Sequence, residues 1–268
     1  MSAFKMTLHL LLLSYVNLVS CGNPATTKTD SPGVRNVNSV GYDLSRPDRT
    51  VSLPPVLLEV SGITVIDSTS VACVQDENGI VFIFDMVKNE IRDQFIFHYA
   101  GDFEGITRVA STFYILRSDG TLFEARNQAS SGNLQQIIES GGPPAEYEGL
   151  CYDNLNHRLL IVPKNNPRQD SGDKKRHPVY GLDLKSGKYT EEPVLEFDLT
   201  EINRYAAENK IEVPDDKKKI VLKVSAIGIH PITKMLYVIS GADRMLFVFD
   251  EDGRINYIEK LDKDLFNM

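Results

Sequence analysis

The sequence predicts an all-β protein, a β-propeller of four-stranded blades, and three observations predict it. From about residue 51 the chain is a succession of short apolar runs separated by turn signals. A glycine motif, here called the elbow, returns as EVSGI (59–63), DFEGI (102–106) and EYEGL (146–150), and three further strand-like runs follow each return. The first elbows are about 43 residues apart, and modules of four strands at this period are typical of propellers.

The chain begins with a segment that we interpret as a lipoprotein signal peptide, residues 1–20. It has one lysine, then an apolar run, then small residues that end at Cys21. Leu18 lies three positions before that cysteine, which resembles the bacterial lipobox and implies cleavage before Cys21 and lipidation of it. The alternative is an ordinary secreted protein that is cleaved nearby.

Residues 21–50 form the predicted tether between the lipid and the folded domain. They are rich in Gly, Pro, Ser, Thr and Asn and cannot bury enough apolar area to order themselves. The predicted propeller domain covers residues 51–268, and we expect 50–59 to add an outer strand to its last blade.

One insertion interrupts the repeat, near 199–219. It has a helical pattern in which Thr200 can cap the first turn and Pro214 lies beyond the end. A passive surface excursion and a lid over one face remain open as alternatives.

A fourth unit begins with the run VSAIGI (224–229). Four units are the fewest that propellers use, so we expect a parent fold of five or six blades whose last blade or blades are truncated in this chain. Such a truncation would leave an open edge and an exposed apolar blade face.

Antiparallel pairing predicts where the elbows gather. Strands 1 and 3 of a blade run in the same direction, so the start of strand 1 and the loop between strands 2 and 3 lie on the same rim. We call this the elbow rim. The candidate site residues that it collects are Glu59, Asp76, Glu104, Arg117, Glu148, Lys164 and Asp243.

Two interpretations of these residues stay open. In the first, each elbow glutamate accepts hydrogen bonds from backbone N–H groups of the turn, and the glycine supplies an unusual φ or a close approach. In the second, Glu104 and Glu148, with Asp76, hold a hard cation such as Ca²⁺ or Mg²⁺. Arg117 and Lys164 then hold a phosphate or carboxylate of a ligand beside it, and Glu59 and Asp243 are further ligand-binding candidates. Carboxylates that face one narrow opening must protonate, separate or gather a cation.

Composition and the absence of known motifs exclude several classes of ligand and of catalytic site. The 268 residues carry a formal net charge of -8, which argues against a nucleic-acid partner. The sequence contains no Trp, so a Trp platform for sugar stacking is excluded. Cys73 and Cys151 lie in apolar runs and are interpreted as buried residues rather than as a disulfide or metal pair. No G-x-S-x-G, H-E-x-x-H or phosphate-binding glycine loop occurs.

The runs LLEVSGI, ACVQDENGIVFIFD, GDFEGI, EYEGLCYD and LLIVPKN together resemble the SdiA-regulated (YjiK/CarP-like) family of bacterial envelope β-propeller lipoproteins. The resemblance covers most of residues 53–262. It implies a lipid-anchored propeller that binds a small ligand, a metal or an envelope protein without catalysis, and a link to calcium. The alternative is a Ca²⁺-dependent, phytase-like phosphoesterase or a lactonase. Gly22 after the cysteine favours the outer membrane over the inner membrane.

Overall fold

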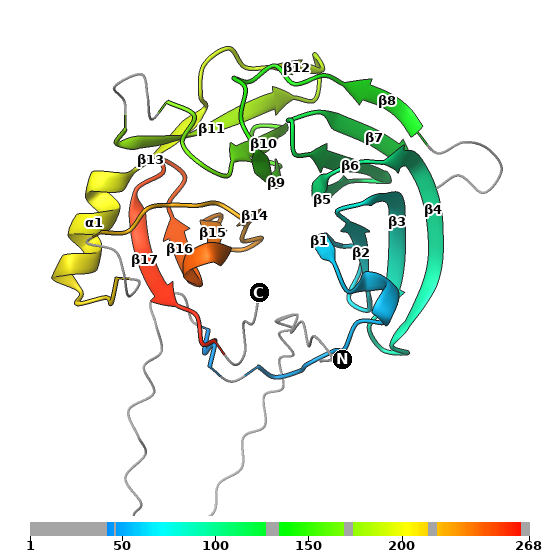
Figure 1. Cartoon of the computed structure of the whole chain (residues 1–268), viewed down its shortest axis with the longest axis horizontal. Coiled ribbons are helices and arrows are strands. Elements are labelled where there is room, and N and C mark those ends of the chain that lie inside the picture. Colours follow the sequence, from blue (N-terminus) through cyan, green and yellow to red (C-terminus); the bar gives the residue numbers. More distant parts are fainter. Residues whose placement is uncertain (1–41, 46, 127–133, 169–173, 214–218, 264–268) are drawn as a thin grey trace, which may run out of the picture.

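The computed structural model describes residues 42–45, 47–126, 134–168, 174–213 and 219–263. Within them the chain folds into four antiparallel sheets arranged around a common centre, so the predicted β-propeller is confirmed with four blades (Figure 1). Blade 1 contains β1 (Val60–Val65), β2 (Ser70–Gln75), β3 (Asn78–Asp85) and β4 (Glu90–Ala100), and blade 2 contains β5 (Phe103–Val109), β6 (Thr112–Arg117), β7 (Leu122–Arg126) and β8 (Leu134–Ile138).

The third and fourth repeat units form blades 3 and 4. Blade 3 contains β9 (Tyr147–Asp153), β10 (Arg158–Pro163), β11 (Arg176–Asp183), β12 (Lys188–Tyr189) and β13 (Leu195–Asp198), and blade 4 contains β14 (Ala226–Ile229), β15 (Leu236–Ser240), β16 (Met245–Phe249) and β17 (Ile255–Lys260). In blade 3 the outer strand is split, because β12 and β13 both pair with β11. Blade 4 has all four strands, so the expected truncation of the last blade is not seen.

Successive side chains of a strand point to opposite faces of its blade, so each strand contributes residues to two separate core clusters. In β2, Ala72 and Val74 face blade 2, where they pack in one cluster with residues such as Phe103 and Phe123. Similar clusters lie between blades 2 and 3 and between blades 3 and 4. Each blade therefore depends on its neighbours for burial, as expected for a radial array of small sheets. Cys151 and Cys73 are buried free cysteines, as predicted, and burial raises the pKa of the Cys73 thiol to about 12.

The elbow glycines allow the inner strands to approach one another closely. A Cβ on Gly62 would lie 2.8 Å from the backbone N of Ile106 and 3.0 Å from the Cα of Gly105. A Cβ on Gly105 would in turn lie 3.0 Å from the Cβ of Leu150 in blade 3. Neither glycine has a positive φ, so close approach and not backbone conformation explains the motif.

The N-terminal segment covers the two end faces of the array, and we call it the strap (residues 42–45 and 47–57). Leu44 packs with Leu246 and Val248 of blade 4, and Val51 and Leu57 pack on blade 1. In Figure 1 this segment, in blue, runs between blades 4 and 1. The strap therefore covers part of the apolar end faces that we expected to be exposed, while Tyr237 and Ile239 of blade 4 remain only partly buried. The expected outer strand at 50–59 is wrong: the segment is irregular up to η1, a short 3-10 helix (Pro55–Leu57), because Pro54 and Pro55 lack the N–H that a strand ladder needs.

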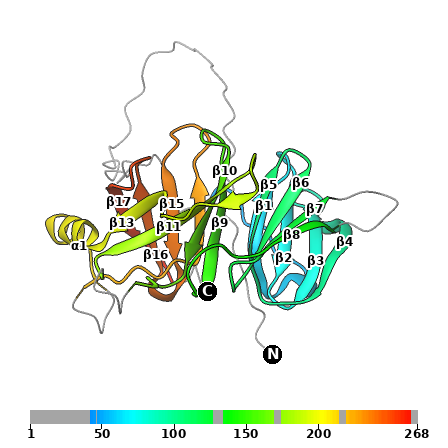
Figure 2. The same cartoon turned by 90° about the horizontal axis from the view of Figure 1, so that it is seen from above.

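The insertion forms α1 (Leu199–Glu208), which packs against β13 and β17 on the outside of the molecule (Figures 1 and 2). Its buried residues Ile202 and Ala206 join the cluster between blades 3 and 4, so it braces two blades and is not a lid. Its N-cap is Asp198 and not Thr200, because the Asp198 carboxylate accepts hydrogen bonds from the N–H groups of Thr200 and Glu201. No helix among the described residues is long and apolar enough to cross a membrane.

Candidate functional site on the elbow rim

The residue before each of the first three elbow glycines is the extra residue of a β-bulge. In blade 2, Phe103 pairs with Arg117 and Gly105 with Leu116, so Glu104 has no partner of its own. The same shift leaves Ser61 in blade 1 and Glu148 in blade 3 between paired residues. A bulge bends the strand and redirects the side chain, and bulges often lie next to functional sites. The repeated motif therefore presents three side chains in equivalent positions.

Backbone hydrogen bonds connect neighbouring blades along the elbow rim. They confirm that the elbows and the loops between strands 2 and 3 lie on the same side of the molecule, as strand direction predicted. The N–H of Phe103 donates to Asp76 O (2.8 Å), linking blades 1 and 2. The N–H of Tyr147 donates to Ser118 O (2.8 Å), and the N–H of Val224 donates to Lys164 O (2.9 Å). The loops between strands 2 and 3 thus hold the start of the next blade.

Lys164 and Glu148 form the best-defined ion pair of this rim. The Lys164 Nζ lies 2.5 Å from Glu148 Oε1 and 3.8 Å from Glu146 Oε2. The Glu148 side chain is only 11% exposed, so solvent screens this pair less than a surface pair. The carboxylates raise the pKa of Lys164, chiefly through the Glu148 hydrogen bond. The lysine therefore stays charged and neutralises Glu148.

Glu104 lies beside this pair without a lysine of its own. Burial, followed by the charges of Glu148 and Asp102, raises the pKa of the Glu104 carboxyl to about 7, even though the charge of Lys164 acts to lower it. The Glu104 carboxyl therefore binds a proton far more readily than an ordinary glutamate does. Raised carboxyl pKa values of this kind cluster at functional sites, although structural networks also produce them.

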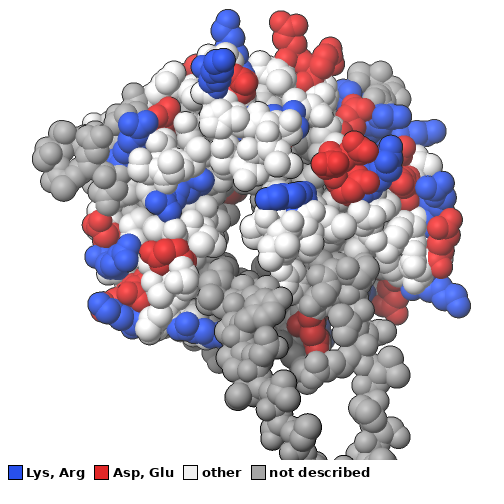
Figure 3. Space-filling model, turned by 180° about the vertical axis from the view of Figure 1, so that it is seen from behind, with Lys and Arg blue, Asp and Glu red and all other residues white. Residues whose placement is uncertain are grey.

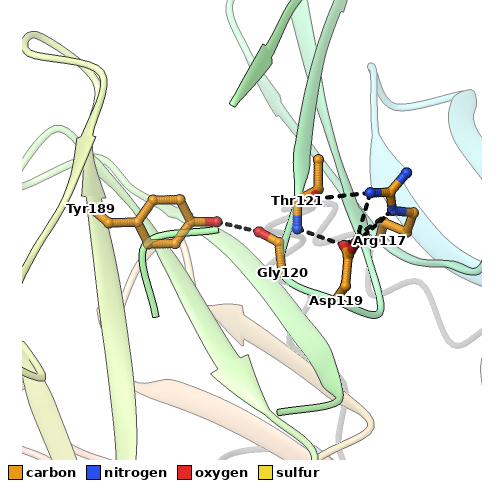
Figure 4. A network of polar contacts seen from close by, with 5 residues as sticks. All are labelled: Arg117, Asp119, Gly120, Thr121 and Tyr189. Carbon is orange, nitrogen blue, oxygen red and sulfur yellow. Dashed lines mark hydrogen bonds and ion pairs between the residues drawn. The ribbon is translucent and has the colours of Figure 1, made fainter. Parts of the chain in front are cut away.

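Arg117 is engaged within its own turn, as Figure 4 shows. Its guanidinium donates to the Asp119 carboxylate from Nε (3.0 Å) and Nη2 (2.7 Å), and Nη2 also donates to Thr121 Oγ1 (3.2 Å). This pairing lowers the pKa of Asp119 to about 2. Beside it, the Tyr189 hydroxyl of blade 3 donates to the carbonyl of Gly120 in blade 2. The arginine therefore supports the rim instead of standing free for an anion.

The remaining candidates are spread along the rim. Glu59 is exposed in the turn before β1, and Asp76 is partly buried after β2 with no hydrogen-bond partner for its buried Oδ1. Asp243 is buried in the short helix η2 (Gly241–Asp243) of blade 4. Within the described residues, no group of three or more His, Cys, Asp or Glu side chains is arranged to hold a metal ion. The structure thus brings together Glu104, Glu148 and Lys164.

Two contacts between blades were not predicted from the motifs. Ser61 donates from its hydroxyl to Phe103 O (2.5 Å), so the bulge residue of blade 1 ties two blades together. Tyr189 was missed because its partner is a backbone carbonyl 69 positions away, which no local pattern encodes. The signal peptide, Cys21 and the early tether lie outside the described residues.

Charges of both signs are interspersed on the face shown in Figure 3, around a central hollow. Among the described residues of that face, Lys and Arg side chains do not merge into one continuous basic area.

No protein-family model and no curated protein matches the chain. Among solved structures, it is similar to a Bacteroides thetaiotaomicron VPI-5482 protein of unknown function, with 10% identity and a TM-score of 0.48 over 74% of this chain and 43% of that one. A streptogramin B lyase matches with 12% identity and a TM-score of 0.45, over 77% and 56% of the two chains. Myxococcus xanthus glutaminyl cyclase matches with 12% identity and a TM-score of 0.49, over 75% and 70%. The chain thus spans about half the length of the first two, and likeness at this level carries no functional argument.

Proposed function

We propose that this protein is a lipid-anchored β-propeller of the bacterial envelope that binds a positively charged ligand on its elbow rim without catalysing a reaction. The lipobox-like run that ends at Cys21 supports the anchor, with the outer membrane as its site. The motif resemblance to the SdiA-regulated family supports the envelope location.

A single observation carries the binding proposal: two bulged glutamates, Glu104 and Glu148, come from neighbouring inner strands, and Lys164 forms an ion pair with Glu148 alone of the two. With Glu146 and Asp102 nearby, ionised carboxylates outnumber Lys164 when Glu104 loses its proton. A cation that replaces this proton would relieve the repulsion. Ca²⁺ and a primary ammonium group are the ligand classes that this chemistry fits.

The test is calorimetric titration with Ca²⁺ alone and with a diamine such as putrescine, at pH 6 and pH 8. We expect binding that is stronger at pH 8, because the cation competes with a proton on Glu104. Glu104→Gln should abolish the pH dependence, whereas Glu90→Gln, on the exposed end of the outer strand β4, should leave binding unchanged. Absence of binding of both probes at pH 8 contradicts the proposal.

The pKa of Glu104 also favours a second candidate, a hydrolase of phosphate esters or lactones in which this carboxyl moves a proton near neutral pH. Assays of phosphatase and lactonase turnover with and without Ca²⁺ separate the two. Turnover that Glu104→Gln removes would establish the enzyme and refute the non-catalytic module. The anchor is tested independently, since Cys21→Ser should move the protein from the membrane fraction to the soluble fraction.

A further inference from the structure

The turns on the side of the molecule opposite the elbow rim expose large apolar side chains. This side, which we call the far rim, collects the turns between strands 1 and 2 and between strands 3 and 4 of each blade. It is the upper side in Figure 2, and Figure 3 views it face on. Val87 (62% exposed), Leu155 (62%) and Ile232 (71%) lie at the tips of three of these turns, in blades 1, 3 and 4.

The same local structure holds all three tips. In each turn, a side chain two positions earlier accepts a hydrogen bond from the backbone N–H of the tip residue. The pairs are Asp85 with Val87 (2.9 Å), Asp153 with Leu155 (3.1 Å) and His230 with Ile232 (3.3 Å). Two positions after the tip the backbone has a positive φ, at Asn89, His157 and Lys234. An ordered turn therefore holds each apolar side chain out of the core.

This turn does not require an apolar tip. Between β11 and β12 of blade 3, Asp183 accepts from the N–H of Ser186 (2.6 Å), Gly187 has the positive φ, and the tip residue is the exposed Lys185. Single exposed apolar residues are common on protein surfaces. Three of them at one position of one turn type, all on the same rim, indicate a surface that contacts something less polar than water.

The chain also enters the propeller at the far rim. Tyr42, the first described residue, forms a hydrogen bond through its hydroxyl with Nε2 of His230, in the turn that carries Ile232. Only 21 positions separate Cys21 from Tyr42, and a flexible chain of this length spans about 25 Å on average. A six-residue strand such as β2 is already about 20 Å long. The predicted tether therefore reaches a bilayer at the far rim easily, but would use most of its span to pass the blades and bring the elbow rim there.

Basic residues accompany the apolar tips. They are Lys88 next to Val87, Lys185 at a tip of its own and Lys234 two positions after Ile232. Lysines beside an anionic membrane surface add to its attraction, and their long side chains keep the charge among the headgroups. The turn between β16 and β17 is acidic, with Glu251 and Asp252, but it joins the outer strands of blade 4, further from the centre than Ile232.

We propose that the far rim lies on the membrane that carries the lipid anchor, with Leu155 and Ile232 inserted at the lipid surface. This inference rests on the lipid anchor of the proposed function, and it adds a second membrane contact and the orientation of the domain. A lipid chain and a second contact hold a protein on a bilayer more firmly than one signal alone. The elbow rim then faces away from the bilayer, where its carboxylates are open to a ligand.

The absence of tryptophan from the sequence provides the test. Leu155→Trp places a single fluorophore at a far-rim tip, Ile232→Trp repeats the measurement in the next blade, and Leu58→Trp beside the elbow rim is the matched control. All three positions are more than half exposed, so the substitutions leave the core intact. The lipidated variants are reconstituted on vesicles of equal parts phosphatidylethanolamine and phosphatidylglycerol. We expect the emission of both far-rim variants to shift to shorter wavelength and to be quenched by brominated acyl chains, and that of Leu58→Trp to do neither.

Flotation of the vesicles separates this inference from the anchor. A wild type that floats with the vesicles, combined with unshifted emission of both far-rim variants, leaves the anchor standing and overturns the docking of the far rim. Equal quenching of Leu155→Trp and Leu58→Trp overturns it too, because the domain then has no fixed orientation. A wild type that does not float overturns the anchor and the docking together. A shift in Leu155→Trp that grows with protein concentration without vesicles identifies a second copy as the occupant of this rim and overturns the membrane contact.

Discussion

Substituting alanine for the elbow glycine of blade 1 tests the blade contacts directly, and Gly228 on the inner strand β14 of blade 4 provides the control. In Gly62→Ala the new Cβ would lie 2.8 Å from Ile106 N, whereas ordinary contacts begin at 3.4 Å. The obstacle is backbone, so no side chain can rotate away and blades 1 and 2 must separate by about 0.6 Å at this point. Overpacking of this kind costs about 1–3 kcal/mol. Gly228 lies two positions after Ala226, the residue of blade 4 that pairs as the elbow glycines do, and it has nothing within 4 Å of its ideal Cβ position.

The two variants should therefore change stability in opposite directions. Alanine removes conformational freedom from the unfolded chain and gains about 0.4–1 kcal/mol where the site has room. We expect Gly228→Ala to stabilise by that amount and Gly62→Ala to destabilise by a net of about 1–2 kcal/mol. Urea unfolding at equilibrium measures both, and melting temperatures should shift by about 2–4 °C per kcal/mol. Equal effects of the two substitutions would refute the packing of β1 against β5.

Three further variants test other parts of the structure. The folded-state pKa of Glu104 is about 7, above its ordinary value of 4.5, so ionisation of this carboxyl destabilises the fold as pH rises through 7. Glu104→Gln should therefore stabilise the fold by about 1–2 kcal/mol at pH 8, a value that allows for partial exposure, and should have no effect at pH 4.5. Urea unfolding at the two pH values measures the difference. Burial lowers the pKa of His177 to about 4 from 6.5, so the stability that the neutral imidazole contributes is complete above pH 6.5 and falls by roughly 3 kcal/mol as pH drops to 4. Over that range the wild type should lose roughly 3 kcal/mol more stability than His177→Gln does, as measured by thermal melts. Tyr189→Phe removes the hydrogen bond between blades 3 and 2 and should cost about 1 kcal/mol in urea unfolding, and an unchanged midpoint would contradict that link.

The repeat predicted most of the fold because one constraint acts on every blade. Strands such as β6 and β10 are apolar on both faces, since a neighbouring blade covers each face, and the elbow glycines mark where inner strands approach. Strand direction then placed the elbows and the loops between strands 2 and 3 on one rim without coordinates. These are consequences of topology and need no knowledge of side-chain positions.

Elements outside the repeat were harder to predict, because contacts distant in sequence decide them. The strap contains apolar residues such as Val51 and Leu53 that suggest a strand, but the face of blade 1 needs only their side chains, and Pro54 and Pro55 exclude a ladder. The start of α1 depends on which oxygen reaches the first N–H groups, and Asp198 stands two positions ahead of Thr200. Capping preferences allow either residue.

For the candidate site, the sequence predicted which charged residues lie on the elbow rim but not which of them form ion pairs with one another. Glu104 and Glu148 have nearly identical motifs, yet Lys164 sits on Glu148 and leaves Glu104 to titrate. Arg117 occupies an equivalent loop in blade 2, but Asp119 two positions later captures its guanidinium. Differences of a few ångström in side-chain reach decide both outcomes, and a single sequence does not contain them.

The three bulges share a backbone shift and a following glycine, which the fold requires, but differ in the side chain of the bulged residue, which the fold leaves variable. The backbone shift is the same at Ser61, Glu104 and Glu148, and the glycine that follows carries the contact with the next blade in each case. In blade 1 a serine fills the bulge and ties two blades together, so the architecture does not require an acid there. Glu104 instead brings a partly buried carboxyl next to two others and destabilises the fold when it ionises. A residue that lowers stability at a position where the same protein elsewhere uses a neutral residue is expected to have a function. Of the whole rim, the elbow between blades 2 and 3 is therefore the position that best fits the ligand site proposed above.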